Sequence, residues 1–157
     1  MALFLVQHGK NLPKDADPDK GLSEEGISEV TRIANVAKEY GIRAAGIYHS
    51  GKARAEQTAQ IFASALDFQG EIREISGMKA MDDVTEFSKK IGREIDSEKN
   101  SMLVGHLPFM EKLTGYLTTG SEEKTVFKFQ NGGIVCLDED REENSWAIQW
   151  TLMPHIG

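Results

Sequence analysis

Four side chains that could act on a phosphoryl group each come a few residues after an apolar run of this sequence. They are His8, Lys52, Arg54 and His106. A neutral imidazole attacks phosphorus well when its other nitrogen is held as a donor. A guanidinium offers two parallel N–H groups to phosphoryl oxygens, and a second imidazole offers one more. These residue types predict transfer of a phosphoryl group, with Ser50 as a further donor.

The elements that must position these residues alternate along the chain. The predicted strands cover residues 2–6, 44–48, 71–75, 102–104, 134–137 and 146–152. The predicted helices run from a cap at Ser23 to Gly41, over 55–66, over 82–95 and from Pro108 onward. This order predicts a three-layer α/β/α sandwich, whose mostly parallel sheet has an antiparallel edge formed by a C-terminal hairpin.

The carboxyl ends of parallel strands lie at one edge of such a sheet, and ligands bind beyond that edge. His8, Arg54 and His106 all follow predicted strands, so we expect them to meet there although they are far apart in sequence. Ser50 could also cap the helix that starts near Arg54. The sequence therefore predicts one anion pocket at the edge of one sheet.

Length and composition exclude several classes of protein. The 157 residues fit one domain, residues 1–157, and 27% charged residues with 39% apolar residues exclude general disorder. A net charge of −7 argues against a nucleic-acid partner, and the single cysteine, Cys136, excludes disulfides and multi-cysteine metal sites. The apolar start, residues 1–6, is too short to span a membrane. We expect a soluble, cytoplasmic protein without a membrane partner.

Three short strings resemble signatures of one enzyme family. Residues 7–9, QHG, are similar to the Arg-His-Gly signature of the histidine phosphatase superfamily, whose fold is like that of phosphoglycerate mutase. Residues 50–58, SGKARAEQT, resemble its second signature, and residues 105–108, GHLP, resemble its late histidine block. Together with the short length, these strings look most like the SixA-type phosphohistidine phosphatases.

The resemblance implies that His8 carries the phosphoryl group during turnover and that Arg54 and His106 line the phosphate pocket. One position departs from the family pattern, because Gln7 stands where the family has arginine. A glutamine can donate an N–H to phosphate but supplies no charge, which lowers a rate on the order of 10²-fold if the loss is fully felt. Lys10 or Lys52 could restore the charge without the fork geometry.

The sequence leaves the proton donor for the leaving group open between Asp82, Asp83 and no carboxylate at all. Imidazole leaves a phosphoramidate already protonated, so phosphohistidine needs no acid, whereas a phosphate ester does. No metal or other cofactor is expected, since the chain has no HExxH pair and no cluster of ligands at metal spacing.

The preferred interpretation is a metal-independent phosphatase that forms a phosphohistidine intermediate and acts on protein phosphohistidine. Phosphate or sulfate should then be able to occupy the pocket. The main alternative is a module that binds phosphate or a phosphoprotein and has lost turnover through Gln7. A third interpretation is a hydrolase of small phosphate esters.

Overall fold

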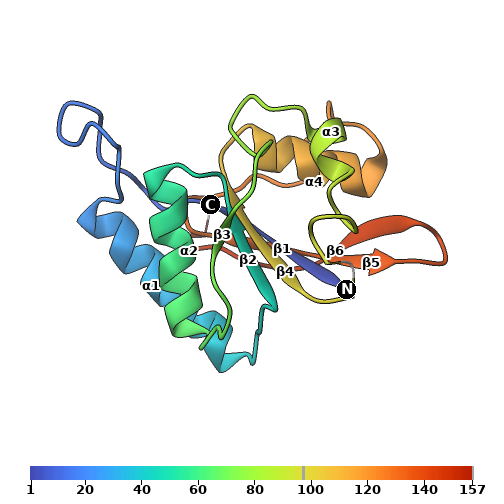
Figure 1. Cartoon of the computed structure of the whole chain (residues 1–157), viewed down its shortest axis with the longest axis horizontal. Coiled ribbons are helices and arrows are strands. Elements are labelled where there is room, and N and C mark those ends of the chain that lie inside the picture. The colour runs from blue at the N-terminus through green and yellow to red at the C-terminus, as the bar shows by residue number, and fades with distance from the viewer. Residues whose placement is uncertain (97, 157) are drawn as a thin grey trace.

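Six strands form one mixed sheet at the centre of the molecule, in the order β3-β2-β4-β1-β5-β6 (Figure 1). The computed structural model describes residues 1–96 and 98–156. The strands are β1 (Ala2–Gln7), β2 (Gly46–His49), β3 (Arg73–Glu74), β4 (Ser101–Gly105), β5 (Ile134–Asp140) and β6 (Ser145–Leu152). β1 to β4 pair in parallel, whereas β5 pairs antiparallel with β1 and β6. The predicted parallel sheet with an antiparallel hairpin edge is confirmed.

Four helices cover the two faces of this sheet. They are α1 (Glu24–Glu39), α2 (Ala53–Ala65), α3 (Val84–Ser88) and α4 (Phe109–Thr119). α1 and α2 lie on one face and α3 and α4 on the other (Figure 1). Ser23 caps α1 as expected, because its Oγ accepts a hydrogen bond from the amide of Gly26 at 3.0 Å.

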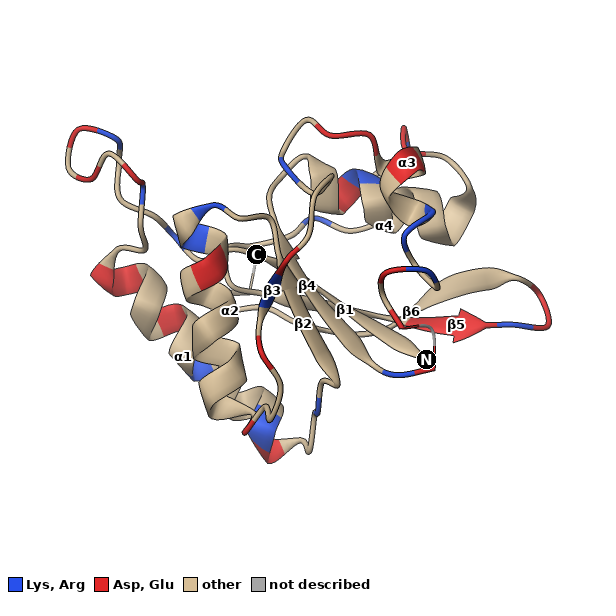
Figure 2. Cartoon of the chain, in the orientation of Figure 1, with Lys and Arg blue, Asp and Glu red and all other residues tan. Residues whose placement is uncertain are grey.

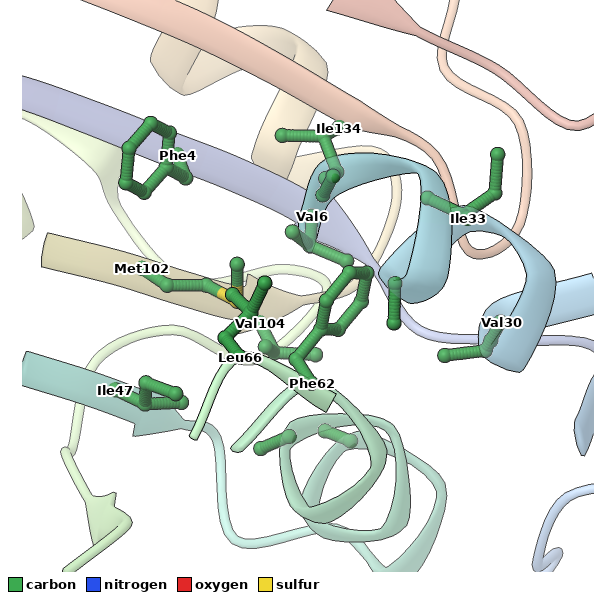
Figure 3. Close-up of a cluster of buried hydrophobic side chains, with 14 of the residues drawn as sticks. Phe4, Val6, Val30, Ile33, Ile47, Phe62, Leu66, Met102, Val104 and Ile134 are labelled. Atoms are coloured by element: carbon green, nitrogen blue, oxygen red, sulfur yellow. The ribbon is translucent and has the colours of Figure 1, made fainter. Parts of the chain in front are cut away.

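β1 is buried on both faces, which explains its unbroken apolar sequence. Phe4 and Val6 pack with α1 and α2, in the cluster that Figure 3 shows around Phe62. Leu3 and Leu5 point the opposite way and pack with α3 and α4. The end of β1, and therefore His8, is fixed by packing on both sides of the sheet.

The third strand and third helix are shorter than the sequence suggests. β3 contains only Arg73 and Glu74, at an exposed edge of the sheet. α3 ends at Ser88, and Gly92 then adopts a positive φ of 91° inside a turn where its amide donates to the carbonyl of Ile95. Glycine reaches this conformation without a steric penalty, so the chain turns where apolar spacing alone predicts a longer helix.

The charged residues lie mainly in the helices and the loops (Figure 2). Acidic residues mark the first turn of α1 and the end of β5, whereas basic residues lie at the start of α2 (Figure 2). Within the described ranges, none of the helices combines the length and apolar character needed to cross a membrane.

Candidate active site

The carboxyl ends of β1, β4 and β2 lie side by side, because these three strands are parallel neighbours. His8 follows β1, His106 follows β4 and Ser50 follows β2, with exposed fractions of 8%, 3% and 3%. The ring centroids of the two histidines are 4.9 Å apart. The strand ends thus bring both predicted histidines together at one edge of the sheet.

The His8 ring is held in one orientation by its neighbour in sequence. Its Nδ1 lies 2.7 Å from the carbonyl oxygen of Gly9, to which a protonated Nδ1 donates. Burial, together with the charge of Arg54 and against the opposing effect of the Gly9 hydrogen bond, lowers the pKa of His8 to about 4. The ring is therefore neutral at pH 7, with its proton on Nδ1 and a lone pair on Nε2. This is the protonation state that a nucleophilic imidazole needs.

Thr58 of α2 links the backbone next to His8 to the backbone of Arg54. The amide of Gly9 donates to Oγ1 of Thr58 at 3.0 Å, and this hydroxyl donates to the backbone carbonyl of Arg54 at 2.7 Å. Gln57 accepts a hydrogen bond from the amide of Leu22 at 2.7 Å, which holds the loop between β1 and α1. The last two residues of the string RAEQT thus have structural partners that the sequence did not reveal.

His106 is paired with Ser50 rather than with a backbone group. Its Nε2 lies 2.6 Å from the Ser50 hydroxyl, and its buried Nδ1 has no hydrogen-bond partner within the described part of the chain. Burial lowers the pKa of His106 to about 3, helped by the charges of His8, Arg54 and Lys52. Ser50 does not cap α2, because Lys52 occupies the N-cap position.

Arg54 lies in the first turn of α2, half-buried, and burial lowers its pKa. Its guanidinium makes no hydrogen bond or ion pair with any described residue. It lines a groove of about 530 Å³, between α2 and the loop after β1, together with the exposed Lys52. An unpaired guanidinium beside two neutral imidazoles and a helix N-terminus is an arrangement suited to a tetrahedral oxyanion.

Gln7 adds no charge to this pocket, and its buried Oε1 has no hydrogen-bond partner in the described residues. Lys10 does not supply the missing charge freely, since its Nζ lies 2.8 Å from Glu25 and 3.5 Å from Glu29. Of the two lysines that could replace the family arginine, Lys52 is the one whose charge acts on His106.

Each predicted acid accepts a hydrogen bond from a nearby backbone amide. Asp82 accepts a hydrogen bond from the amide of Lys79 at 2.8 Å, and Asp83 caps α3 by accepting one from Thr85 at 2.8 Å. Sequence reasoning missed Glu74, whose carboxylate lies against Gly51, so that a Cβ on this glycine would overlap Oε1. The available signal was that Glu74 stands near the carboxyl end of the third predicted strand.

Burial of these neutral histidines predicts a specific pH dependence of stability. His8 has an ordinary pKa of 6.5 and a folded-state pKa of about 4, so between these values the unfolded chain binds more protons. The contribution of His8 to the free energy of unfolding is therefore complete above pH 6.5. The free energy of unfolding should fall by about 3 kcal/mol as the pH is lowered to 4. His106 acts in the same direction. Urea unfolding above pH 6.5 and at pH 4, in phosphate-free buffer, measures this fall in the free energy of unfolding. The fall should be smaller for His8→Gln than for the parent protein, and an equal fall would contradict its assignment to His8.

Among the described residues, no group of three or more His, Cys, Asp and Glu side chains is arranged to hold a metal ion.

Comparisons with known proteins identify both the family and the fold of this chain. The profile of the histidine phosphatase superfamily (branch 1) matches residues 3–82. No curated protein sequence matches this chain significantly.

Solved structures resemble the chain over nearly its whole length. The protein histidine phosphatase SixA, in complex with tungstate, matches with a TM-score of 0.86 at 22% identity, covering 98% of this chain and 97% of that chain. A protein assigned as phosphohistidine phosphatase SixA from Agrobacterium tumefaciens matches with 0.77 at 27% identity, covering 98% and 97%. A protein assigned as alpha-ribazole-5'-P phosphatase from Escherichia coli str. K-12 matches with 0.78 at 16% identity, covering 100% and 98%.

Proposed function

The chain belongs to the histidine phosphatase superfamily (branch 1), and from this premise we propose that it is a phosphatase that works through a phosphohistidine intermediate on His8. The observation that carries the proposal is the state of the His8 ring, which is neutral, with Nδ1 held by the Gly9 carbonyl and Nε2 left with its lone pair. Arg54 and His106 stand beside it.

In the proposed reaction, Nε2 of His8 forms a bond to phosphorus as the bond between phosphorus and the leaving group breaks. Arg54 binds two of the phosphoryl oxygens and offsets the charge that they carry in the transition state. Ser50 and His106 form one hydrogen-bonded unit beside them, and Gln7 and Lys52 complete the set of proposed phosphate ligands. Water then attacks phosphorus, His8 leaves with its electron pair, and inorganic phosphate is released.

The preferred substrate is phosphohistidine on a protein. The SixA structure that resembles this chain holds tungstate, a tetrahedral oxyanion, and another similar protein is assigned as a phosphohistidine phosphatase. An imidazole leaving group departs already protonated, which fits a site where Asp82 and Asp83 are both engaged in local hydrogen bonds. For an ester substrate, Glu74 is the carboxylate that we propose as proton donor, because it lies against the loop between Ser50 and Lys52.

The test is to incubate the protein with a radiolabelled phosphoramidate or a phosphohistidine protein. We expect an acid-labile, base-stable label on the protein and release of inorganic phosphate, both unchanged by EDTA. Parallel assays with p-nitrophenyl phosphate measure ester hydrolysis. A protein that binds phosphate but shows neither label nor release would contradict the proposed activity.

One observation favours the second candidate, a module that binds phosphate or a phosphoprotein without turnover: Gln7, which is half-buried next to His8, brings no charge to the pocket. The variant Gln7→Arg separates the two. If the missing charge limits turnover, the variant should react up to about 10²-fold faster. If the parent protein is active and Gln7→Arg has the same rate or a lower one, then Lys52 supplies the charge of the missing arginine or the substrate binds in a different geometry.

A further inference from the structure

The peptide group between His8 and Gly9 is held at both of its ends. Its N–H donates to Oγ1 of Thr58 at 3.0 Å, and its carbonyl oxygen accepts a hydrogen bond from Nδ2 of Asn131 at 3.0 Å. The preceding carbonyl, that of Gln7, accepts a hydrogen bond from the amide of Gly132 at 2.8 Å. The main chain at the nucleophile is therefore fixed by α2 on one side and by the turn before β5 on the other.

This turn is itself held by the segment that follows β6. The side chain of Gln130 accepts from the amide of His155 at 2.9 Å and donates to the carbonyl of the same residue at 3.0 Å. Gly133 packs against Met153 so closely that a Cβ would overlap its sulfur atom. Arg32 of α1 donates a hydrogen bond to the carbonyl of Pro154 at 2.8 Å. This bond fixes the segment after β6 to α1.

The side chain of His155 contacts α1, and the same residue of α1 contacts the loop that follows His8. Its Nε2 contacts Oε2 of Glu29, a residue of α1 that is 8% exposed. The other carboxylate oxygen of Glu29 lies 3.5 Å from Nζ of Lys10, two residues after His8. Contacts thus lead from residue 8 through Asn131 and Gln130 to His155, and back through Glu29 and Lys10.

We propose that Asn131 is a positioning residue for phosphoryl transfer, acting through the His8–Gly9 peptide, and that Gln130 and His155 keep it in place. The inference rests on the proposed function of His8. Asn131 holds the carbonyl of His8, and the ring bonds to the carbonyl of the next residue, Gly9. A rotation of the His8–Gly9 peptide therefore displaces the Gly9 carbonyl relative to the ring and changes the direction of the Nε2 lone pair. Misplacement of a nucleophile by a fraction of an ångström slows attack without weakening the binding of phosphate elsewhere in the pocket.

Asn131→Ala should lower kcat about tenfold while KM and the affinity for inorganic phosphate stay within about twofold, since Arg54 and His106 are untouched. Asn131→Asp should be at least as slow, because its carboxylate repels the His8 carbonyl. Gln130→Ala and His155→Ala should slow turnover in the same direction but less, and His155→Gln should recover part of the loss by donating to Glu29. Gln69→Ala is the matched control: it removes an amide-to-carbonyl bond of 2.9 Å at the surface, to Asp67.

Two readouts separate this inference from the function it rests on. If the parent protein shows no label and no turnover, the proposed function fails. Hydrogen exchange at the Gly9 amide still tests the positioning role, since we expect faster exchange in Asn131→Ala than in Gln69→Ala. If turnover is present, a normal kcat in Asn131→Ala, or a rise of KM that accounts for the whole effect, would overturn the role of Asn131.

Discussion

Replacing His8 with alanine should leave phosphoryl transfer below about 1% of the parent rate, because the bond that carries the phosphoryl group can no longer form. The acid-labile label should disappear completely. Inorganic phosphate should still bind, since Arg54 and the His106–Ser50 pair remain in place. Rapid-quench labelling and phosphate release measure the chemistry, and equilibrium titration with phosphate measures the binding.

His49→Asn is a matched control for this variant. His49 is also a buried histidine at a strand end, but its Nδ1 accepts a hydrogen bond from the amide of Gly51 at 3.1 Å, and an asparagine oxygen can accept the same bond. We expect full labelling of His49→Asn. A His8→Ala protein that keeps its label, or a His49→Asn protein that loses it while remaining folded, would move the nucleophile away from His8.

The sequence predicted the part of the site that follows from strand order. β1 and β4 are continuous apolar runs, and parallel neighbours end at the same edge, so the meeting of His8 and His106 required no knowledge of loop geometry. Arg54 was predictable for a related reason, because it stands in the first turn of the helix that follows β2. These features depend on periodicity and topology, which local sequence encodes.

Features that depend on long-range contacts were not predictable. Ser50 looked like a helix cap, yet its hydroxyl pairs with His106, 56 residues later in the chain. The ring of His155 contacts Glu29 across 126 residues of sequence, and nothing in the sequence indicates this pair. The hydrogen bond from Asn131 to the His8 carbonyl spans 123 residues. Sequence spacing carries no information on such pairs, because tertiary packing alone brings them within reach.

The proton donor shows a different limit. The helix expected to begin at Asp82 or Asp83 does begin there, and Asp83 is its N-cap, but the helix ends at Ser88 rather than near residue 95. Glu74 lies on a predicted strand, but its contact with Gly51 of the loop after β2 follows only from the fold. Marginal elements at the edge of a sheet are set by their neighbours rather than by their own sequence, so the side chains they carry are located only once the fold is known.

Arg54→Ala is expected to lower kcat/KM by about 10²- to 10³-fold, the range found when a donor to a developing charge is removed. The change should leave the fold intact, because Thr58 bonds to the backbone carbonyl of residue 54 and the guanidinium has no partner among the described residues to lose. Phosphate affinity should fall together with the rate, since the same fork binds the oxyanion in the ground state and in the transition state. Steady-state kinetics and phosphate titration measure both losses.

Arg54→Lys shows how much of this loss comes from geometry rather than charge. A lysine keeps the positive charge but cannot bind two oxygens in one plane, so we expect only partial recovery of both phosphate affinity and rate. Arg43→Ala is the matched control: it removes an exposed arginine just before β2, at the opposite edge of the sheet, and should change neither quantity. If Arg54→Ala kept the phosphate affinity and the rate of the parent protein, Lys52 would be the cation that binds the phosphoryl group. Arg54 would then only line the groove without binding the substrate.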